Sequence, residues 1–179
     1  MSASLQQLLS QQPPTTSGIH EAVALHSEAI FKQFRGILPF FLGKRESGPF
    51  INLTLPNSVI QSSDALLQTL SDLIWVYKLK TVSFVSALRV KETEDGEAAM
   101  KALLITADSK SAYFQLLWDL DFDEHADITA SRRSERDIEV LPKELWSQIF
   151  SMKVPADART LSYDRLAERF GGEEEIPQP

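Results

Sequence analysis

The chain has 179 residues, of which 43% are hydrophobic and 24% are charged, and it contains no cysteine. These values are typical of one globular domain, and they exclude a disulfide framework, a thiolate metal site and a cysteine nucleophile. The formal net charge of -7 argues against a general binder of nucleic acid or of anionic membranes, because such a protein needs a cationic surface.

The N-terminal part of the chain contains one clear helical pattern. Residues 1–17 are rich in Gln, Ser, Thr and Pro, so we expect a flexible arm or a short helix that becomes ordered against a partner. From Ile19 to Ile37 apolar residues recur with helical spacing, which predicts an amphipathic helix that ends before Pro39. No run of about eighteen apolar residues occurs, so we expect a soluble protein without a membrane span. The absence of cysteine fits a cytoplasmic location.

A strand and a second helix are expected next. Residues 50–55 alternate apolar and polar side chains, which predicts a strand that ends at Pro56. Ser62 or Ser63 is in place to cap the following helix, whose apolar stripe runs as far as Tyr77.

Three strand-length segments between Thr81 and Asp123 alternate apolar and polar residues, and this is the strongest pattern in the chain. They predict an antiparallel meander with turns at 92–97 and 108–111. One row of the third strand is expected to face the core, and its members are Phe114, Leu116, Trp118, Leu120 and Phe122.

The remainder of the chain is more polar. Residues 123–139 are mostly charged or polar, so we expect an exposed loop there. Pro142 is in place for the first turn of a further helix. A last helix is expected from Ser162, acting as its cap, to a stop at Gly171.

Together these elements predict an α+β fold in which an antiparallel sheet of about four to five strands is packed by helices, in the order helix, strand, helix, three-strand meander, helix, helix. A single domain is expected over residues 18–171, between the flexible arm 1–17 and an acidic flexible tail 172–179. In its order of elements the chain resembles roadblock-like, profilin-like and nuclear-transport-factor-like domains, which also alternate helices with a curved antiparallel sheet.

The stretch from Thr160 to Gly171 contains a tyrosine, a leucine-alanine-glutamate triplet and a phenylalanine-glycine pair. In this order of residues it resembles the first helix of a helix-turn-helix motif. In that motif a recognition helix follows the glycine. Here Gly172 leads into three glutamates, so we expect this helix to dock on the sheet or on a partner rather than on DNA.

The end of the third strand is a candidate metal site, because Asp119, Asp121 and Asp123 alternate there. The spacing begins like a calcium loop, but Glu124 occupies the position of the loop's glycine and Ala130 that of its bidentate glutamate. We therefore predict no metal site, and we interpret the carboxylates as a solvent-facing strand edge that discourages pairing.

The histidines give no catalytic pattern. His20 and His26 lie on different parts of the first helix, and each is interpreted as a half-buried structural residue. No catalytic residue and no cofactor is predicted.

The candidate interface residues are large apolar or aromatic side chains outside the expected core rows. Trp75 lies off the main apolar stripe of its helix, and aromatic residues of this kind are enriched at interfaces. Leu103 and Ile105 on the second strand of the meander, with Tyr113 and Leu117 on the third, give the second face of the sheet an apolar character. Either the terminal helices cover that face, or a second copy or another protein does.

These observations predict a non-enzymatic module for protein interaction or assembly, such as an adaptor, a chaperone or an inhibitor, that self-associates through the sheet or a helix. The expected partner is another protein, with a homodimer as one form. One alternative is a small-molecule-binding or enzymatic domain with a pocket between sheet and helices. Another is an acidic inhibitor that mimics nucleic acid.

Overall fold

The computed structural model describes residues 3–91, 94–136 and 140–179. The chain divides into two compact units, each assembled from three separated segments. Unit 1 consists of Met1–Pro39, Ser83–Thr106 and Tyr113–Val140, and unit 2 consists of Phe40–Val82, Ala107–Ala112 and Leu141–Pro179. Because the segments alternate along the chain, these units do not correspond to the arm, domain and tail expected from the sequence, and the single domain over 18–171 stays a prediction.

Six strands form one antiparallel sheet in the order β2-β1-β3-β4-β5-β6. The predicted α+β class, with helices packed on an antiparallel sheet, is confirmed. The sheet has more strands than expected, because β1 (Phe40–Lys44) and β6 (Ile128–Arg133) were not predicted. The expectation of an exposed loop over 123–139 is therefore wrong where β6 forms, while residues 137–139 lie outside the described part of the chain.

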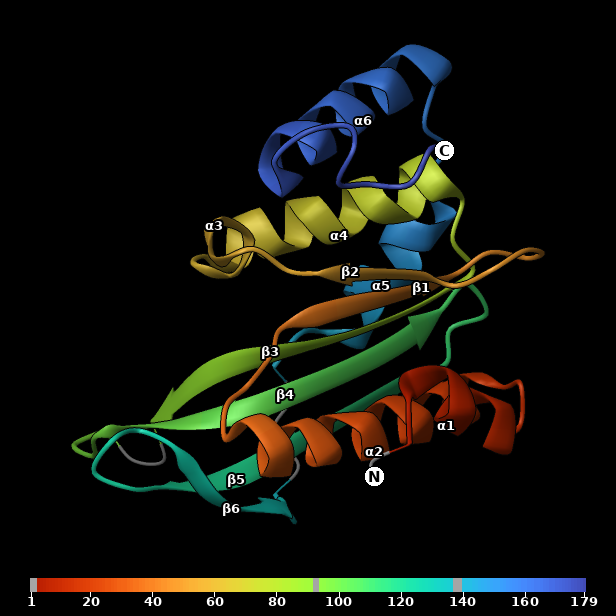
Figure 1. Cartoon of the computed structure of the whole chain (residues 1–179). Helices are drawn as coiled ribbons and strands as arrows, with labels where there is room; N and C mark the ends of the chain where they lie inside the picture. Colours follow the sequence, from red (N-terminus) through yellow and green to blue (C-terminus); the bar gives the residue numbers. More distant parts are fainter. Residues whose placement is uncertain (1–2, 92–93, 137–139) are drawn as a thin grey trace. The chain divides into compact units, whose positions relative to one another are not determined.

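In unit 1, helix α1 (Leu5–Gln11) packs against helix α2 (Thr16–Phe34), as Figure 1 shows. α1 begins with a capping box in which Ser4 and Gln7 each accept the other's backbone N–H. Gly18 permits a close approach at the start of α2, since a Cβ atom there would lie 2.0 Å from the carbonyl oxygen of Pro13. Part of the expected arm is therefore helical within this chain.

α2 ends at Arg35, which adopts the left-handed conformation with φ 54. The N–H of Arg35 donates to the carbonyl of Phe31, and the carbonyl of Arg35 accepts the N–H of Ile128 at 2.8 Å. The prediction of a helix that stops before Pro39 is confirmed, and the stop also ties α2 to β6.

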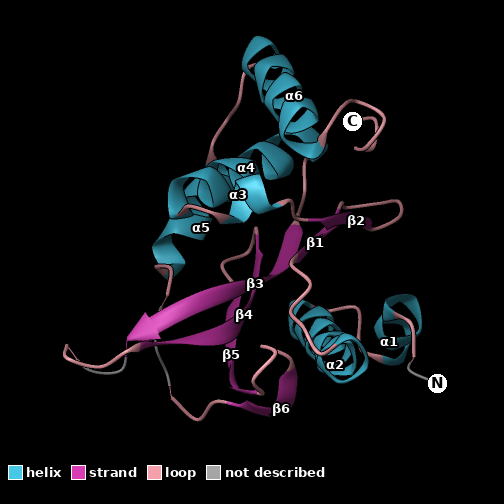
Figure 2. Ribbon diagram, turned by 60° about the vertical axis from the view of Figure 1, so that its left-hand side comes forward, coloured by secondary structure: helices cyan, strands magenta, loops and turns pink. Residues whose placement is uncertain are grey.

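The predicted meander is confirmed, with the bounds β3 Thr81–Lys91, β4 Ala98–Asp108 and β5 Tyr113–Phe122. The predicted turn at 92–97 lies partly outside the described residues. α2 packs on β5 and β6 (Figure 2). The row of β5 that was expected to face the core is only partly buried: Trp118 is 0% exposed, but Phe114 and Phe122 are 37% and 39% exposed.

Within the described residues, unit 2 contains the hairpin of β1 and β2 and four helices. Their remaining bounds are β2 Ile51–Thr54, α3 Asn57–Ile60, α4 Ser63–Tyr77, α5 Lys143–Ser151 and α6 Ala156–Phe170. Ser62 caps α4 as predicted, since its hydroxyl accepts the N–H of Ala65. α6 begins earlier than predicted, so Ser162 is a buried residue inside the helix and not its cap. Gly171 ends α6 with φ 93, as predicted.

Helices α4 and α6 pack together through a buried carboxylate (Figure 1). Asp72 of α4 is 0% exposed and accepts two hydrogen bonds from the guanidinium of Arg165 on α6, at 2.7 and 3.0 Å. A nitrogen of Arg169 lies 3.8 Å from the same carboxylate and donates to the hydroxyl of Thr69. Hydrogen bonding to Asp72 raises the pKa of Arg165.

The segment after α6 folds back against unit 2. Ile176 is 4% exposed, and the Tyr77 hydroxyl donates to the carbonyl of Pro177 at 2.5 Å. The side chain of Gln178 donates to the hydroxyl of Tyr163. These contacts differ from the fully solvated tail expected for residues 172–179. None of the helices in the described residues is both long enough and apolar enough to cross a membrane.

Candidate interaction site at the edge of β6

The residues predicted to form an interface lie mostly in the core. Leu103, Ile105 and Leu117 are 4%, 0% and 3% exposed, so their own chain covers them. Tyr113 is half-buried and its hydroxyl donates to the side chain of Gln115 at 3.1 Å. These residues belong to unit 1 and do not form an exposed apolar face.

Trp75, the predicted exposed anchor, belongs to unit 2 and is half-buried. Its indole N–H donates to the carbonyl of Ile149 at 3.1 Å. This bond joins α4 to α5 and gives the indole a role within the unit.

The acidic end of β5 is not a free edge, because β6 pairs with it. Asp119 accepts a hydrogen bond from Lys101, which lowers the pKa of Asp119 below its usual range, and Arg132 lies 3.3 Å from Asp121. Asp123 accepts the backbone N–H groups of two residues in the following turn. Among the described residues, no group of His, Asp and Glu side chains is arranged to hold a metal ion.

The structure brings His20 together with two buried hydroxyl groups that the sequence did not connect. Nδ1 of His20 lies 2.9 Å from Oγ1 of Thr106, which lies 2.8 Å from Oγ of Ser83. Both hydroxyl residues are 0% exposed, so a substrate has no access to them, and we assign the network a structural role. Burial lowers the pKa of His20 from 6.5 to about 4, while Glu21 raises it and Arg133 lowers it by smaller amounts.

This low pKa predicts a pH-dependent stability. His20 stays neutral in the folded protein, whereas the unfolded chain binds a proton below pH 6.5, so stability is lost as the pH falls from 6.5 towards 4. The expected loss between pH 7 and pH 5 is about 2 kcal/mol from this residue. Urea unfolding of the parent and of His20→Gln at both pH values measures it. The exposed His125→Gln serves as control, and equal pH dependence in parent and His20→Gln would contradict the prediction.

Strand β6 forms one end of the sheet and, among the described residues, pairs on one side only. Residues in antiparallel strands alternate between hydrogen-bonded and non-hydrogen-bonded pairs. The N–H of Ser134 donates to the carbonyl of Leu117 at 2.8 Å, and the N–H of Asp123 donates to the carbonyl of Asp127 at 3.0 Å. These two bonds fix the alternation at both ends of β6.

The alternation directs the backbone groups of Ile128, Ser131 and Arg133 away from β5. The outward N–H of Ile128 is used, because it donates to the carbonyl of Arg35. Ser131 and Arg133 present outward groups that have no backbone partner within the described part of the chain. An edge of this kind can pair with a strand from another chain.

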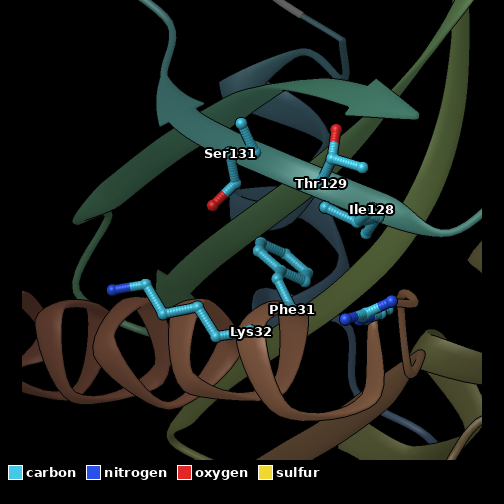
Figure 3. A pocket seen from close by; sticks show the side chains of 7 residues that line it. Phe31, Lys32, Ile128, Thr129 and Ser131 are labelled. Atoms are coloured by element: carbon cyan, nitrogen blue, oxygen red, sulfur yellow. The ribbon is translucent and has the colours of Figure 1, made fainter. Parts of the chain in front are cut away.

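A groove borders this edge. It has a volume of about 470 Å³ and lies between the C-terminal half of α2 and β6. In Figure 3 the ring of Phe31 and the side chain of Ile128 point into it, the Ser131 hydroxyl points toward α2, and Thr129 points away from α2. The β6 groove is lined by Phe31, Lys32, Arg35, Ile128, Thr129, Ala130 and Ser131.

Hydrogen bonds join α2 to β6 at both ends of the groove. At one end, the guanidinium of Arg133 donates to both oxygens of Glu21 at 2.9 and 3.0 Å, and to Glu28 at 2.7 Å. These hydrogen bonds raise the pKa of Arg133. At the other end, the carbonyl of Arg35 holds the N–H of Ile128. The groove therefore has fixed walls and a buried apolar floor.

The sequence contained a weak signal for this site. Residues 128–133 begin with Ile128 and Thr129, β-branched types that favour strands, directly after a turn at 123–127. The charged residues around them favoured the prediction of an exposed loop. The partners of Arg133, which are Glu21 and Glu28, lie far away in the sequence and could not be recognised from it.

Comparisons of this chain with protein-family models, with curated proteins and with solved structures give no match.

Proposed function

We propose that this protein is a non-enzymatic interaction module that binds an extended segment of another protein along the free edge of β6. The observation that carries the proposal is the pair of outward-facing residues Ser131 and Arg133 beside a preformed groove. In this binding mode the backbone hydrogen bonds supply affinity, and the neighbouring side chains supply specificity.

The location of the apolar residues supports this mode. Phe31 and Ile128, which form the floor of the β6 groove, are 1% and 6% exposed. The exposed positions of β6 carry small or charged side chains, so its side-chain surface alone offers little apolar area. Main-chain pairing needs no large apolar patch, and this suits an edge with free backbone groups.

Two proline substitutions in β6 test the proposal. The N–H of Ser131 faces outward, so Ser131→Pro removes a donor from the free edge and none from the pairing with β5. The N–H of Ala130 faces Asp121 in β5, so Ala130→Pro removes a hydrogen bond of the sheet and is expected to lower the melting temperature well below that of the parent. We expect Ser131→Pro to keep the melting temperature within a few degrees of the parent.

The binding readout is a random peptide library displayed on phage, selected against the full chain. We expect enriched peptides that protect the amides of Ser131 and Arg133 from hydrogen exchange and that lose binding to Ser131→Pro. If no peptide is enriched, or if enriched peptides bind Ser131→Pro as tightly as the parent, pairing along β6 is wrong.

A further inference from the structure

The side chains of an added strand alternate between the two faces of the sheet. At the edge of β6, one of these faces is the side on which α2 packs. Every second residue of a bound segment therefore points toward the β6 groove, where Lys32 and Arg35 project from α2. The chemistry of these two side chains determines which residues the segment carries at those positions.

Both cations are available to a ligand. Lys32 is exposed and has no hydrogen-bond or ion-pair partner among the described residues. Arg35 is held only loosely by a carboxylate, since its nitrogen lies 3.9 Å from Asp127, and the two side chains are 65% and 47% exposed. A contact of this kind between exposed groups contributes little and is easily exchanged.

The other carboxylates near the groove are already occupied. Glu21 and Glu28 bind Arg133, and Asp121 binds Arg132. In a chain with a net charge of -7, the residues that line the β6 groove carry two positive charges, those of Lys32 and Arg35, and no negative charge.

We infer that the segment bound along β6 is acidic, with glutamate or aspartate at alternate positions facing α2. This inference rests on the proposed function. Carboxylates at these positions form ion pairs with Lys32 or with Arg35, and one of them accepts a hydrogen bond from the Ser131 hydroxyl, which points toward α2 (Figure 3). Such charge complementarity selects the partner and speeds association.

A second copy of this chain is a poorer occupant. Its own β6 groove would bring a second Lys32 and a second Arg35 to an edge that already presents these two cations. Like charges placed together at an interface are unfavourable, so the edge favours an acidic segment of a different protein.

The probe is a fluorescein-labelled ten-residue peptide of alternating threonine and glutamate, and its binding to the full chain is followed by fluorescence anisotropy. Matched peptides carry glutamine or lysine in place of glutamate. We expect the glutamate peptide to bind about tenfold more tightly than the glutamine peptide, with the difference reduced by added salt. Lys32→Glu should weaken the glutamate peptide about tenfold and strengthen the lysine peptide. Lys153→Glu, an exposed lysine in unit 2 with the same change of charge, should alter binding less than about twofold.

The outcomes separate this inference from the proposed function. If the glutamine peptide binds as tightly as the glutamate peptide and both lose binding to Ser131→Pro, the edge pairs but the acidic preference is wrong. Peptides that bind Ser131→Pro and the parent equally would overturn both ideas. If no peptide binds at about millimolar concentration and sedimentation shows a dimer that Ser131→Pro dissociates, the occupant is a second copy and the acidic segment is wrong.

Discussion

Replacing Trp118 with alanine should destabilise the protein by about 4 kcal/mol, because large-to-small substitutions of buried aromatic residues cost about 3–5 kcal/mol. The indole is 0% exposed, and its ring lies 5.3 Å from that of Phe31 in an edge-to-face arrangement. Its N–H also donates to Glu28 at 3.0 Å. The substitution removes one of the contacts through which α2 packs on β5, and leaves that between the rings of His20 and Phe114.

The measurement is urea unfolding followed by far-UV circular dichroism, which does not depend on the fluorescence of the deleted tryptophan. Phe122→Ala is the matched control, since Phe122 lies on the same strand but is 39% exposed, and we expect it to cost about 1 kcal/mol or less. Equal costs for the two variants would show that Trp118 is not a principal core residue.

Replacing Asp72 with asparagine should destabilise the protein by about 3 kcal/mol, at the lower end of the range for a broken buried ion pair. Asp72 is fully buried, so the amide that replaces it cannot balance the charge of Arg165. The side chains of Arg165 and Arg169 are 37% and 23% exposed, and water can therefore compensate part of the loss.

A double variant tests whether the loss of stability arises from breaking the ion pair or from removing the charge of Asp72. Asp72→Leu with Arg165→Leu removes both members, and such apolar replacements are often close to neutral, so the double variant should be more stable than Asp72→Asn. Asp164→Asn on the exposed face of α6 is the control and should change stability by less than about 0.5 kcal/mol. A loss in the double variant equal to the sum of the losses of Asp72→Leu alone and Arg165→Leu alone would contradict a coupled pair.

The elements with regular apolar spacing could be predicted from the sequence. The end of α2 before Pro39, the cap of α4 at Ser62, the stop of α6 at Gly171 and the three strands of the meander follow local rules of spacing and capping. Local rules suffice there because the signal lies within a few neighbouring residues.

The start of α6 shows where local rules failed. Ser162 has the character of a cap, but it lies inside α6, where its hydroxyl accepts a hydrogen bond from Arg165 three residues later, and Pro155 stands at the cap position instead. Similarly, Pro142 stands just before α5 and not in its first turn. A serine or proline marks the neighbourhood of a helix start but does not fix its position.

The proposed site could not be predicted for a different reason. β6 depends on contacts with residues distant in the sequence, such as the bonds from Arg133 to Glu21 and from Ile128 to Arg35. The interface predicted on Leu103, Ile105 and Leu117 assumed that the second face of the sheet was uncovered. Alternation shows which residues share a face, but it does not show what covers that face.

The left-handed conformation of Arg35 at the end of α2 limits where a bound segment can lie along β6. The carbonyl of Arg35 occupies the outward N–H of Ile128, so a strand added to β6 meets a stop at this residue. It can extend past Arg133 but not past Ile128. A partner segment therefore has one fixed end, at Ile128. The number of residues from this end determines whether a side chain of the segment points toward α2 or toward the opposite face of the sheet. This geometric stop would select among overlapping stretches of the same acidic sequence.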